Sequence, residues 1–219
     1  REFLLKALKE DGQLLKRAAK TLQADREVVL VAVKAFGRAL QYAAESLQAD
    51  REIVLAAVKQ DSRALDFSHQ DLKADRDVVL AAVKQDGYAL EEAHDSLKAD
   101  HEVVLEAMKQ NGGAFRAAAE SLKSDREFML KVVKIHGWAL QYAAEPLQAD
   151  REIVLAAVKR SCAISVRAPI QTWLLKHAPK SIKSDREIVL AAVQQDPGAL
   201  YESSEELQQD EELRKIAGV

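Results

Sequence analysis

Apolar and polar positions recur along this chain with a period of 25 residues. One apolar position and one aspartate position show it best, and their spacing lengthens only once, by ten residues. A fixed period in this range is typical of proteins built from stacked helical units. The recurring positions are Leu22, Leu47, Leu72, Leu97, Leu122, Leu147, Ile182 and Leu207, and Asp25, Asp50, Asp75, Asp100, Asp125, Asp150, Asp185 and Asp210.

The pattern within each unit predicts two short helices. Asp25 is a suitable N-cap for a first helix of about eleven residues that carries an apolar block and ends at Gly37. We expect this glycine to adopt the left-handed conformation that costs glycine least. In the SDRE segments, a capping box from Ser124 or Ser184 is an alternative to the aspartate cap. The second helix is expected to run about nine residues from the glycine. The equivalent glycines are Gly87, Gly112 and Gly137.

Helices this short are marginal alone, so stacking of neighbouring units is their expected source of stability. The sequence therefore predicts an all-α fold, an α-solenoid of about eight 25-residue two-helix repeats. Two globular helical bundles are the alternative, and they would need a break in the register. We expect one helical-repeat domain over residues 1–219, belonging to a longer chain.

The two ends of the array differ. Arg214 and Lys215 occupy positions that are apolar in the full repeats, which predicts a polar C-terminal cap at residues 211–219. The first unit keeps its apolar block from Phe3 to Leu8. We expect that end to be covered by missing repeats or by another chain.

Residues 40–59 and 140–159 are identical except that Ser46 is replaced by Pro146. They lie four periods apart, so we interpret them as two copies of the structural framework. Pro146 is expected at the end of a second helix, where a lost amide does little harm.

Ten residues, 162–171, are added where a single glycine normally turns the chain. They include Ile164, Val166 and Ile170, and the repeat pattern resumes with Trp173 at the position of Trp138. The insert could pack as an extra half-turn, dock another subunit, or be a tolerated loop. We favour the first.

Charge and composition exclude several classes of protein. The chain has 48% hydrophobic residues, and 32 basic against 35 acidic side chains give a net charge of −3. No basic stripe typical of a nucleic-acid binder is visible, and no apolar run approaches a membrane span. The single cysteine, Cys162, forms no internal disulfide and indicates a reducing compartment. We expect a cytoplasmic protein, with organelle targeting left open because the sequence lacks an initiator methionine.

The recurring Asp-Arg-Glu triplet is the main charged motif. It could line a ladder that recognises an ionic partner, but a structural role is favoured, because helix-end and inter-unit contacts explain the triplet without a ligand. His69 and His94 share one repeat position, and we expect surface histidines rather than a zinc site, since no third ligand is evident. We expect no cofactor, no metal and no catalytic site, Cys162 included.

The positions that vary between units are the expected contacts with a partner. Residues just after the glycine and four residues later lie on one helix face and form a stripe rich in aromatic and arginine side chains. The alternative is that these rings pack between successive second helices. With the insert, the candidate partner-binding residues are Arg38, Tyr42, Arg63, Phe67, Tyr88, Trp138, Tyr142, Ile164, Val166, Ile170 and Trp173.

The repeated signature resembles a known family. Asp25, Arg26, Glu27, Leu30, Val33, Lys34, Gly37, Ala39 and Leu40 fit a tandem helical repeat family catalogued as domain of unknown function 4116, and most of them recur in other units. The resemblance covers nearly the whole chain and implies a helical-repeat fold but no reaction. The chain departs from the family's pattern at residues 162–171.

We therefore predict a non-catalytic scaffold that binds another protein, with no nucleic acid and no membrane span. A structural subunit of a large complex is the alternative. A solenoid enzyme and an array that binds one RNA base per unit are less favoured.

Overall fold

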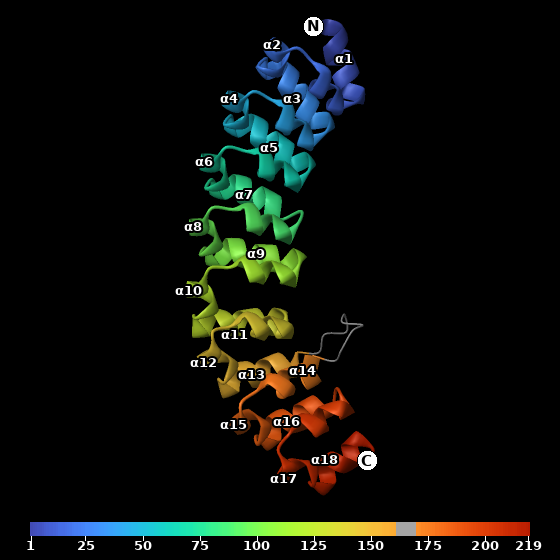
Figure 1. Cartoon of the computed structure of the whole chain (residues 1–219), viewed down its shortest axis with the longest axis vertical. Coiled ribbons are helices and arrows are strands. Elements are labelled where there is room, and N and C mark those ends of the chain that lie inside the picture. Colours follow the sequence, from blue (N-terminus) through green and yellow to red (C-terminus); the bar gives the residue numbers. More distant parts are fainter. Residues whose placement is uncertain (161–169) are drawn as a thin grey trace. The chain divides into compact units, whose positions relative to one another are not determined.

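The computed structural model describes residues 1–160 and 170–219 (Figure 1). Those residues form α-helices and 3₁₀ helices joined by short turns, and no strand occurs among them. The expected all-α repeat fold is confirmed. The chain divides into two compact units, residues 1–119 and 120–219, and each is described by itself. The single domain over 1–219 stays a prediction.

In unit 1, the long helices α1, α3, α5, α7 and α9 follow one another in a stack, with 3₁₀ helices and four-residue helices between them (Figure 1). The elements are α1 Glu2–Glu10, η1 Gly12–Arg17, α2 Lys20–Gln23, α3 Arg26–Ala35, η2 Gly37–Tyr42, α4 Glu45–Gln48, α5 Arg51–Gln60, η3 Ser62–Phe67, α6 Gln70–Lys73, α7 Arg76–Val83, η4 Gly87–Glu92, α8 Asp95–Lys98, α9 His101–Gln110 and η5 Gly112–Ala117.

Unit 2 repeats this order, except where α14 takes the place of a 3₁₀ helix. Its elements are α10 Glu120–Lys123, α11 Arg126–Ile135, η6 Gly137–Tyr142, α12 Glu145–Gln148, α13 Arg151–Lys159, α14 Ile170–His177, α15 Lys180–Lys183, α16 Arg186–Val193, η7 Pro197–Glu202, α17 Glu205–Gln208 and α18 Glu211–Ala217.

Aspartate is the N-cap of α3, α5, α7, α9, α11, α13, α16 and α18. In α3, the Asp25 carboxylate accepts hydrogen bonds from the amides of Glu27 and Val28, at 3.0 and 3.1 Å. This satisfies two amides that have no partner within the helix. At the SDRE segments the N-caps are Asp125 and Asp185, so the serine capping box is wrong there.

The core lies between successive long helices and beneath the 3₁₀ helices. In α3, Val28, Val29, Ala32 and Val33 are fully buried, and α5, α7, α9, α11, α13 and α16 bury the equivalent residues. Leu40 of η2 is likewise buried. Each apolar block is therefore covered on opposite sides, which explains why most of its positions are apolar.

The expected second helix of nine residues is divided into two pieces. A six-residue 3₁₀ helix, such as Gly37–Tyr42, is followed by an extended turn at Ala43 and Ala44 and then by a separate four-residue α-helix. Pro146 accordingly lies at the start of α12, not at the end of a helix, and the amide it lacks is one that the first turn leaves free.

The framework glycines are needed for close approach, and the left-handed caps expected for them are wrong. Among the described residues only Gly218 has a positive φ, of 76°. A β-carbon on Gly37 would lie 2.4 Å from the carbonyl oxygen of Ala57 in the next repeat. At Gly12, Gly87 and Gly137 the same contact, to the equivalent alanine, would measure 2.2–2.4 Å.

Three repeats carry a side chain at this glycine position, Ser62, Thr172 and Pro197. After Ser62 and Thr172 the next long helix, α7 or α16, is eight residues long and closes with a bond between residues three apart. After Pro197 the next helix, α18, has seven residues. Helices that follow a framework glycine within a unit have nine or ten residues. The larger side chain is thus accommodated by a tighter helix end.

A backbone hydrogen bond links the short helices of consecutive repeats. The amide of Ala44 donates to the carbonyl of Gln23 at 2.9 Å, and equivalent bonds follow at His69, His94, Ala119, Ala144 and Ser204. Pro179 stands at this position after the insert, and proline has no amide hydrogen to donate. The repeat that carries the insert therefore lacks this link.

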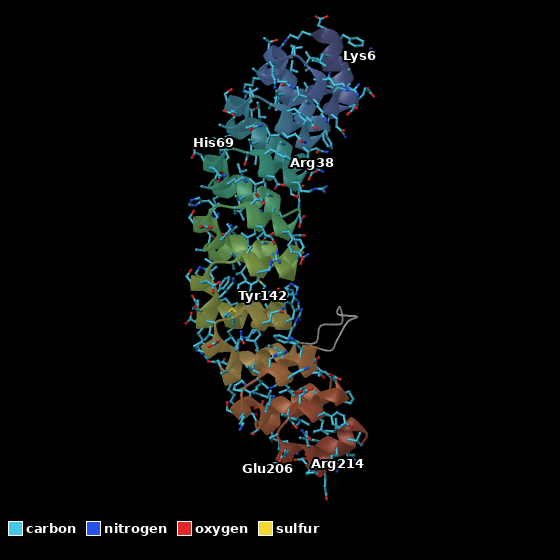
Figure 2. The ribbon with its side chains drawn as sticks, in the orientation of Figure 1. Lys6, Arg38, His69, Tyr142, Glu206 and Arg214 are labelled. Atoms are coloured by element: carbon cyan, nitrogen blue, oxygen red, sulfur yellow. The ribbon has the colours of Figure 1, made fainter. Side chains whose placement is uncertain are left out.

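The C-terminal helix α18 buries Leu213 while Arg214 and Lys215 are exposed, as Figure 2 shows for Arg214. These two residues replace apolar positions that earlier repeats bury or half-bury. The polar C-terminal cap over residues 211–219 stays a prediction.

Candidate functional site

The Asp-Arg-Glu triplets form a ladder of ion pairs between consecutive repeats. Arg26 binds Asp50 at 2.8 Å through Nε, and its Nη2 contacts Glu52. Asp50 at the same time caps its own helix through the amides of Glu52 and Ile53. Each arginine thus pairs with the cap of the next repeat. Equivalent arginines are Arg1, Arg51 and Arg76 in unit 1, and Arg126, Arg151 and Arg186 in unit 2.

These contacts change the acidity of the capping aspartates. The Arg1 guanidinium, together with the Val28 amide, lowers the pKa of Asp25 to about 2. Hydrogen bonds from Arg26, Arg51 and Arg126 likewise hold the pKa of Asp50, Asp75 and Asp150 below the ordinary value. The carboxylates therefore stay charged and paired, which supports the structural interpretation of the triplet.

In unit 1, the predicted stripe lies on the outer surface of the 3₁₀ helices. Arg38, Tyr42 and Phe67 are half-buried, whereas Arg63 and Tyr88 are exposed, Tyr88 by 46%. Nε of Arg38 is buried without a hydrogen-bond partner among the described residues. Some stripe residues are thus partly packed into the protein, whereas Arg63 and Tyr88 are accessible to a partner.

Polar contacts fix several neighbours of the stripe. Asp61 caps η3 through the Arg63 amide and also pairs with the Arg63 guanidinium at 3.2 Å. Asp86 caps η4 by accepting from the amide of Tyr88. The Tyr88 hydroxyl packs against Gly113 and occupies the space that a side chain would need there. Aspartates before the 3₁₀ helices therefore orient stripe residues, a role the sequence analysis did not assign to them.

In unit 2, candidate aromatic residues contact rings of their own repeat. Trp138 and Tyr142 meet edge to face with ring centroids 5.9 Å apart, and Trp173 lies 4.7 Å from His177. Figure 2 labels Tyr142. All three candidate rings are half-buried, so part of each surface remains accessible.

The insert candidates Ile164 and Val166 lie outside the described residues, as does Cys162. Ile170 is the first residue of α14. Gln171, the next residue, is buried and donates to Gln195 at 2.7 Å. The end of the insert is therefore part of a packed helix, and the role of the remainder stays a prediction.

His69 and His94 cap the short helices α6 and α8. Their Nδ1 atoms accept from the amides of Asp71 and Ser96, at 3.3 and 3.2 Å. Both side chains are exposed along the edge of the short helices, where Figure 2 labels His69. In the described part of the chain, no group of three or more His, Cys, Asp or Glu side chains is placed to hold a metal.

A pocket of about 290 Å³ opens beside Tyr42, between the first two repeats. Lys16, Lys20, Gln23 and Gln41 line it together with Tyr42 and two alanines. The ammonium group of Lys16 lies 5.9 Å from the centroid of the Tyr42 ring. This concave site was not predicted, because Lys16 and Lys20 precede the repeats in which the stripe was defined.

A second depression of about 410 Å³ lies in unit 2, on the outer face of α11 and α13. It is lined by the apolar residues Leu130, Leu155 and Ala156 and by the charged residues Lys134, Glu152, Lys159 and Arg160. Lys159 already pairs with Glu187 at 3.0 Å.

A family model covers most of the chain. The model, described as Domain of unknown function (DUF4116), matches residues 1–43, 25–73, 75–123, 125–167 and 170–214. The chain belongs to this family. Matches such as 75–123 span two of the 25-residue repeats, so the DUF4116 unit corresponds to a pair of them. No curated protein and no solved structure matches the chain.

Within the described residues, no helix of this DUF4116 chain has both the length and the apolar character that a membrane crossing requires.

Proposed function

We propose that this chain is a non-catalytic helical-repeat scaffold that binds another protein through the variable face of its 3₁₀ helices. One observation carries the proposal. At equivalent positions of a repeated framework, the accessible side chains differ from repeat to repeat, as Arg63, Tyr88 and Trp138 do. Framework positions such as the capping aspartate are constant because each has a structural contact to make.

The composition of this face supports protein binding. Tyrosine and arginine provide large contact areas and several hydrogen-bond donors, and both are enriched at the energetic centres of protein interfaces. Tyr88 and Arg63 are exposed on adjacent repeats whose 3₁₀ helices pack together. A partner lying along unit 1 would contact both.

The proposal also covers the cellular setting and the exclusion of other ligands. Mixed charges argue against nucleic acid as the main ligand, since such proteins carry a basic stripe. A single cysteine fits an intracellular, cytoplasmic location. Cell fractionation tests the location, and a filter-binding assay with mixed RNA tests the exclusion.

Photo-cross-linking tests the interface. Benzoylphenylalanine in place of Tyr88 is expected to cross-link a partner in cells that express the full chain. The matched control carries the same residue in place of Tyr201, which is 65% exposed on η7 of unit 2. Equal cross-linking from both positions, or none from Tyr88, would contradict binding at the stripe.

Substitution separates binding from packing. Replacing Tyr42, Phe67 and Tyr142 with serine is expected to abolish partner capture. If capture persisted while thermal stability fell, the rings would be packing residues and the proposed interface would be wrong.

A further inference from the structure

The pocket beside Tyr42 differs from the rest of the 3₁₀ face in its charge. Lys16 of η1 and Lys20 of α2 both line it, and the structure gives neither an ion pair with any described residue. Arg17, which lies between them in sequence, likewise has no ion pair in the described structure. Glu45 follows the pocket's alanines in sequence but pairs with neither lysine. The pocket is therefore cationic and uncompensated.

The ring of Tyr42 forms a wall of this pocket. Tyr42 belongs to the second repeat and is half-buried, while Lys16 belongs to the first. At 5.9 Å from the ring centroid, the Lys16 ammonium is within the range of a cation–π contact. The contact holds one cation at the pocket while its remaining donors stay free.

The amide donors that line the pocket are already engaged. Gln23 Nε2 donates to the carbonyl of Leu15 at 3.0 Å, and Gln41 Nε2 to the carbonyl of Arg38 at 2.9 Å. Lys16 and Lys20 are thus the strong donors left for a ligand, and they favour an anion.

The framework does not require lysine at these two positions. The later repeats of unit 1 carry other pairs there: Gln41 and Glu45, Asp66 and Gln70, and Glu91 and Asp95. These repeats form the same 3₁₀ helix and short helix without lysine at these positions, so the fold does not require the two lysines of the first repeat.

Charge along this face differs between the first and the fourth repeat of unit 1. Residues 12–23 contain three cations and no acid, whereas residues 87–98 contain one cation and three acids. A gradient of this kind selects the orientation of a charged partner. The acidic end of a bound segment would lie at the first repeat.

We propose that this pocket binds an acidic side chain from a partner's peptide segment. The carboxylate lies between the ammonium groups of Lys16 and Lys20, and the carbon atoms next to it pack on the Tyr42 ring. This inference rests on the proposed function and specifies its partner as an acidic protein segment. The uncompensated charge, the aromatic wall and the absence of lysine from the equivalent positions of the other repeats of unit 1 support it.

Selection from random twelve-residue peptides displayed on phage tests the inference on the intact chain. Recovered peptides are expected to be enriched in Asp and Glu and to bind more weakly as salt rises. A Lys16→Gln/Lys20→Gln variant is expected to bind them about tenfold more weakly. The matched control, Lys34→Gln/Lys59→Gln, removes two exposed lysines from the ends of α3 and α5 and is expected to bind as the unmodified chain does.

Several outcomes would overturn the inference. These are peptides without acidic enrichment, acidic peptides that bind both variants equally, or a polyuridine RNA that binds better than the peptides and depends on the same lysines. If the inference fails while cross-linking from Tyr88 succeeds, the proposed function stands without this pocket. If lysine-dependent peptides are found but Tyr88 cross-links nothing, the proposed interface at the stripe is wrong, whereas the inference about the pocket stands.

Discussion

Gly37 lies against the backbone of the next repeat with no room for a side chain. We predict that Gly37→Ala lowers the free energy of unfolding by about 1–3 kcal/mol, because the carbonyl of Ala57 must move to admit a methyl group. The entropy that alanine removes from the unfolded chain offsets only about 0.4–1 kcal/mol. Urea unfolding followed by circular dichroism measures the difference.

Gly198→Ala is the matched control. The nearest atom to a β-carbon there is the Asp196 carboxylate oxygen at 3.3 Å, a tight contact that a shift of a few tenths of an ångström in that side chain relieves. We expect a much smaller change than at Gly37. Equal losses at the two glycines would show that close approach is not the reason for Gly37.

The arginine ladder predicts how stability depends on acid. Asp25 has a pKa of about 2 in the folded chain against an ordinary value of 3.8, so its contribution is complete above the ordinary value and is lost as pH falls through about 2. We expect the free energy of unfolding to fall over that window. In an Arg26→Gln/Arg51→Gln variant, Asp50 and Asp75 lose the partners that lower their pKa, and the decline is expected to be shallower.

Urea unfolding at several pH values between 5 and 2 checks this prediction. Arg63→Gln is the control, since Arg63 pairs with Asp61 of its own repeat. A double variant whose stability fell with pH as steeply as that of the unmodified chain would contradict the role of the ladder.

Among the elements, the break between each 3₁₀ helix and the short helix that follows can be tested with proline. Ala44 has φ −59°, which proline adopts without strain, and only the hydrogen bond to Gln23 is lost. We predict that Ala44→Pro costs no more than about 1.5 kcal/mol. A continuous nine-residue helix would lose about 3 kcal/mol or more at the same residue.

Ala57→Pro provides the comparison, because Ala57 lies inside α5 and is fully buried. Thermal melts of the two variants should differ clearly. Similar losses would mean that the helix continues through Ala44.

The elements also show how far the sequence predicts this fold. The period of 25 residues and the Asp25 N-cap are enough to predict α3, because capping and helical periodicity are local properties of the sequence. The 3₁₀ helix was missed because Ala39, Leu40 and Ala43 fit either kind of helix, and an alanine pair carries no turn signal. The role of Gly37 depends on a carbonyl twenty residues away, which no local pattern reveals.

The candidate site was predicted less completely than the fold. The stripe follows from repeat alignment, and Arg63 and Tyr88 lie exposed on it. The pocket of Lys16 and Lys20 depends on the ring of Tyr42 reaching across from the next repeat. A contact between repeats of this kind is visible only once their packing is known.

At the scale of the whole molecule, the contacts described between repeats of a unit join only neighbouring repeats, so stability is expected to be a sum over repeats and their interfaces. We predict that deleting residues 51–75, one complete period, leaves a helical and cooperatively folding chain. Arg26 keeps Asp50 and Arg76 keeps Asp100. The urea m-value should fall in proportion to the shorter chain.

Deletion of residues 51–62 is the control. It removes α5 and the first residue of η3 and leaves the rest of η3 without its preceding helix, so the repeats lose their register. Circular dichroism and urea unfolding distinguish the two deletions, and equal damage from both would contradict a modular array.

The ion pair between Arg151 and Asp185 spans the insert, yet it has the same geometry as pairs between uninterrupted repeats. Each interface between consecutive repeats therefore depends on the two surfaces that meet, and does not depend on the length of chain that connects them. The gene that encodes such an array can lengthen by duplication of whole units. Each new unit carries both an arginine for the next unit and a capping aspartate for the arginine of the preceding one. The near-identity of residues 40–59 and 140–159 is the expected trace of that process, and afterwards the exposed positions of each copy are free to diverge toward separate binding specificities.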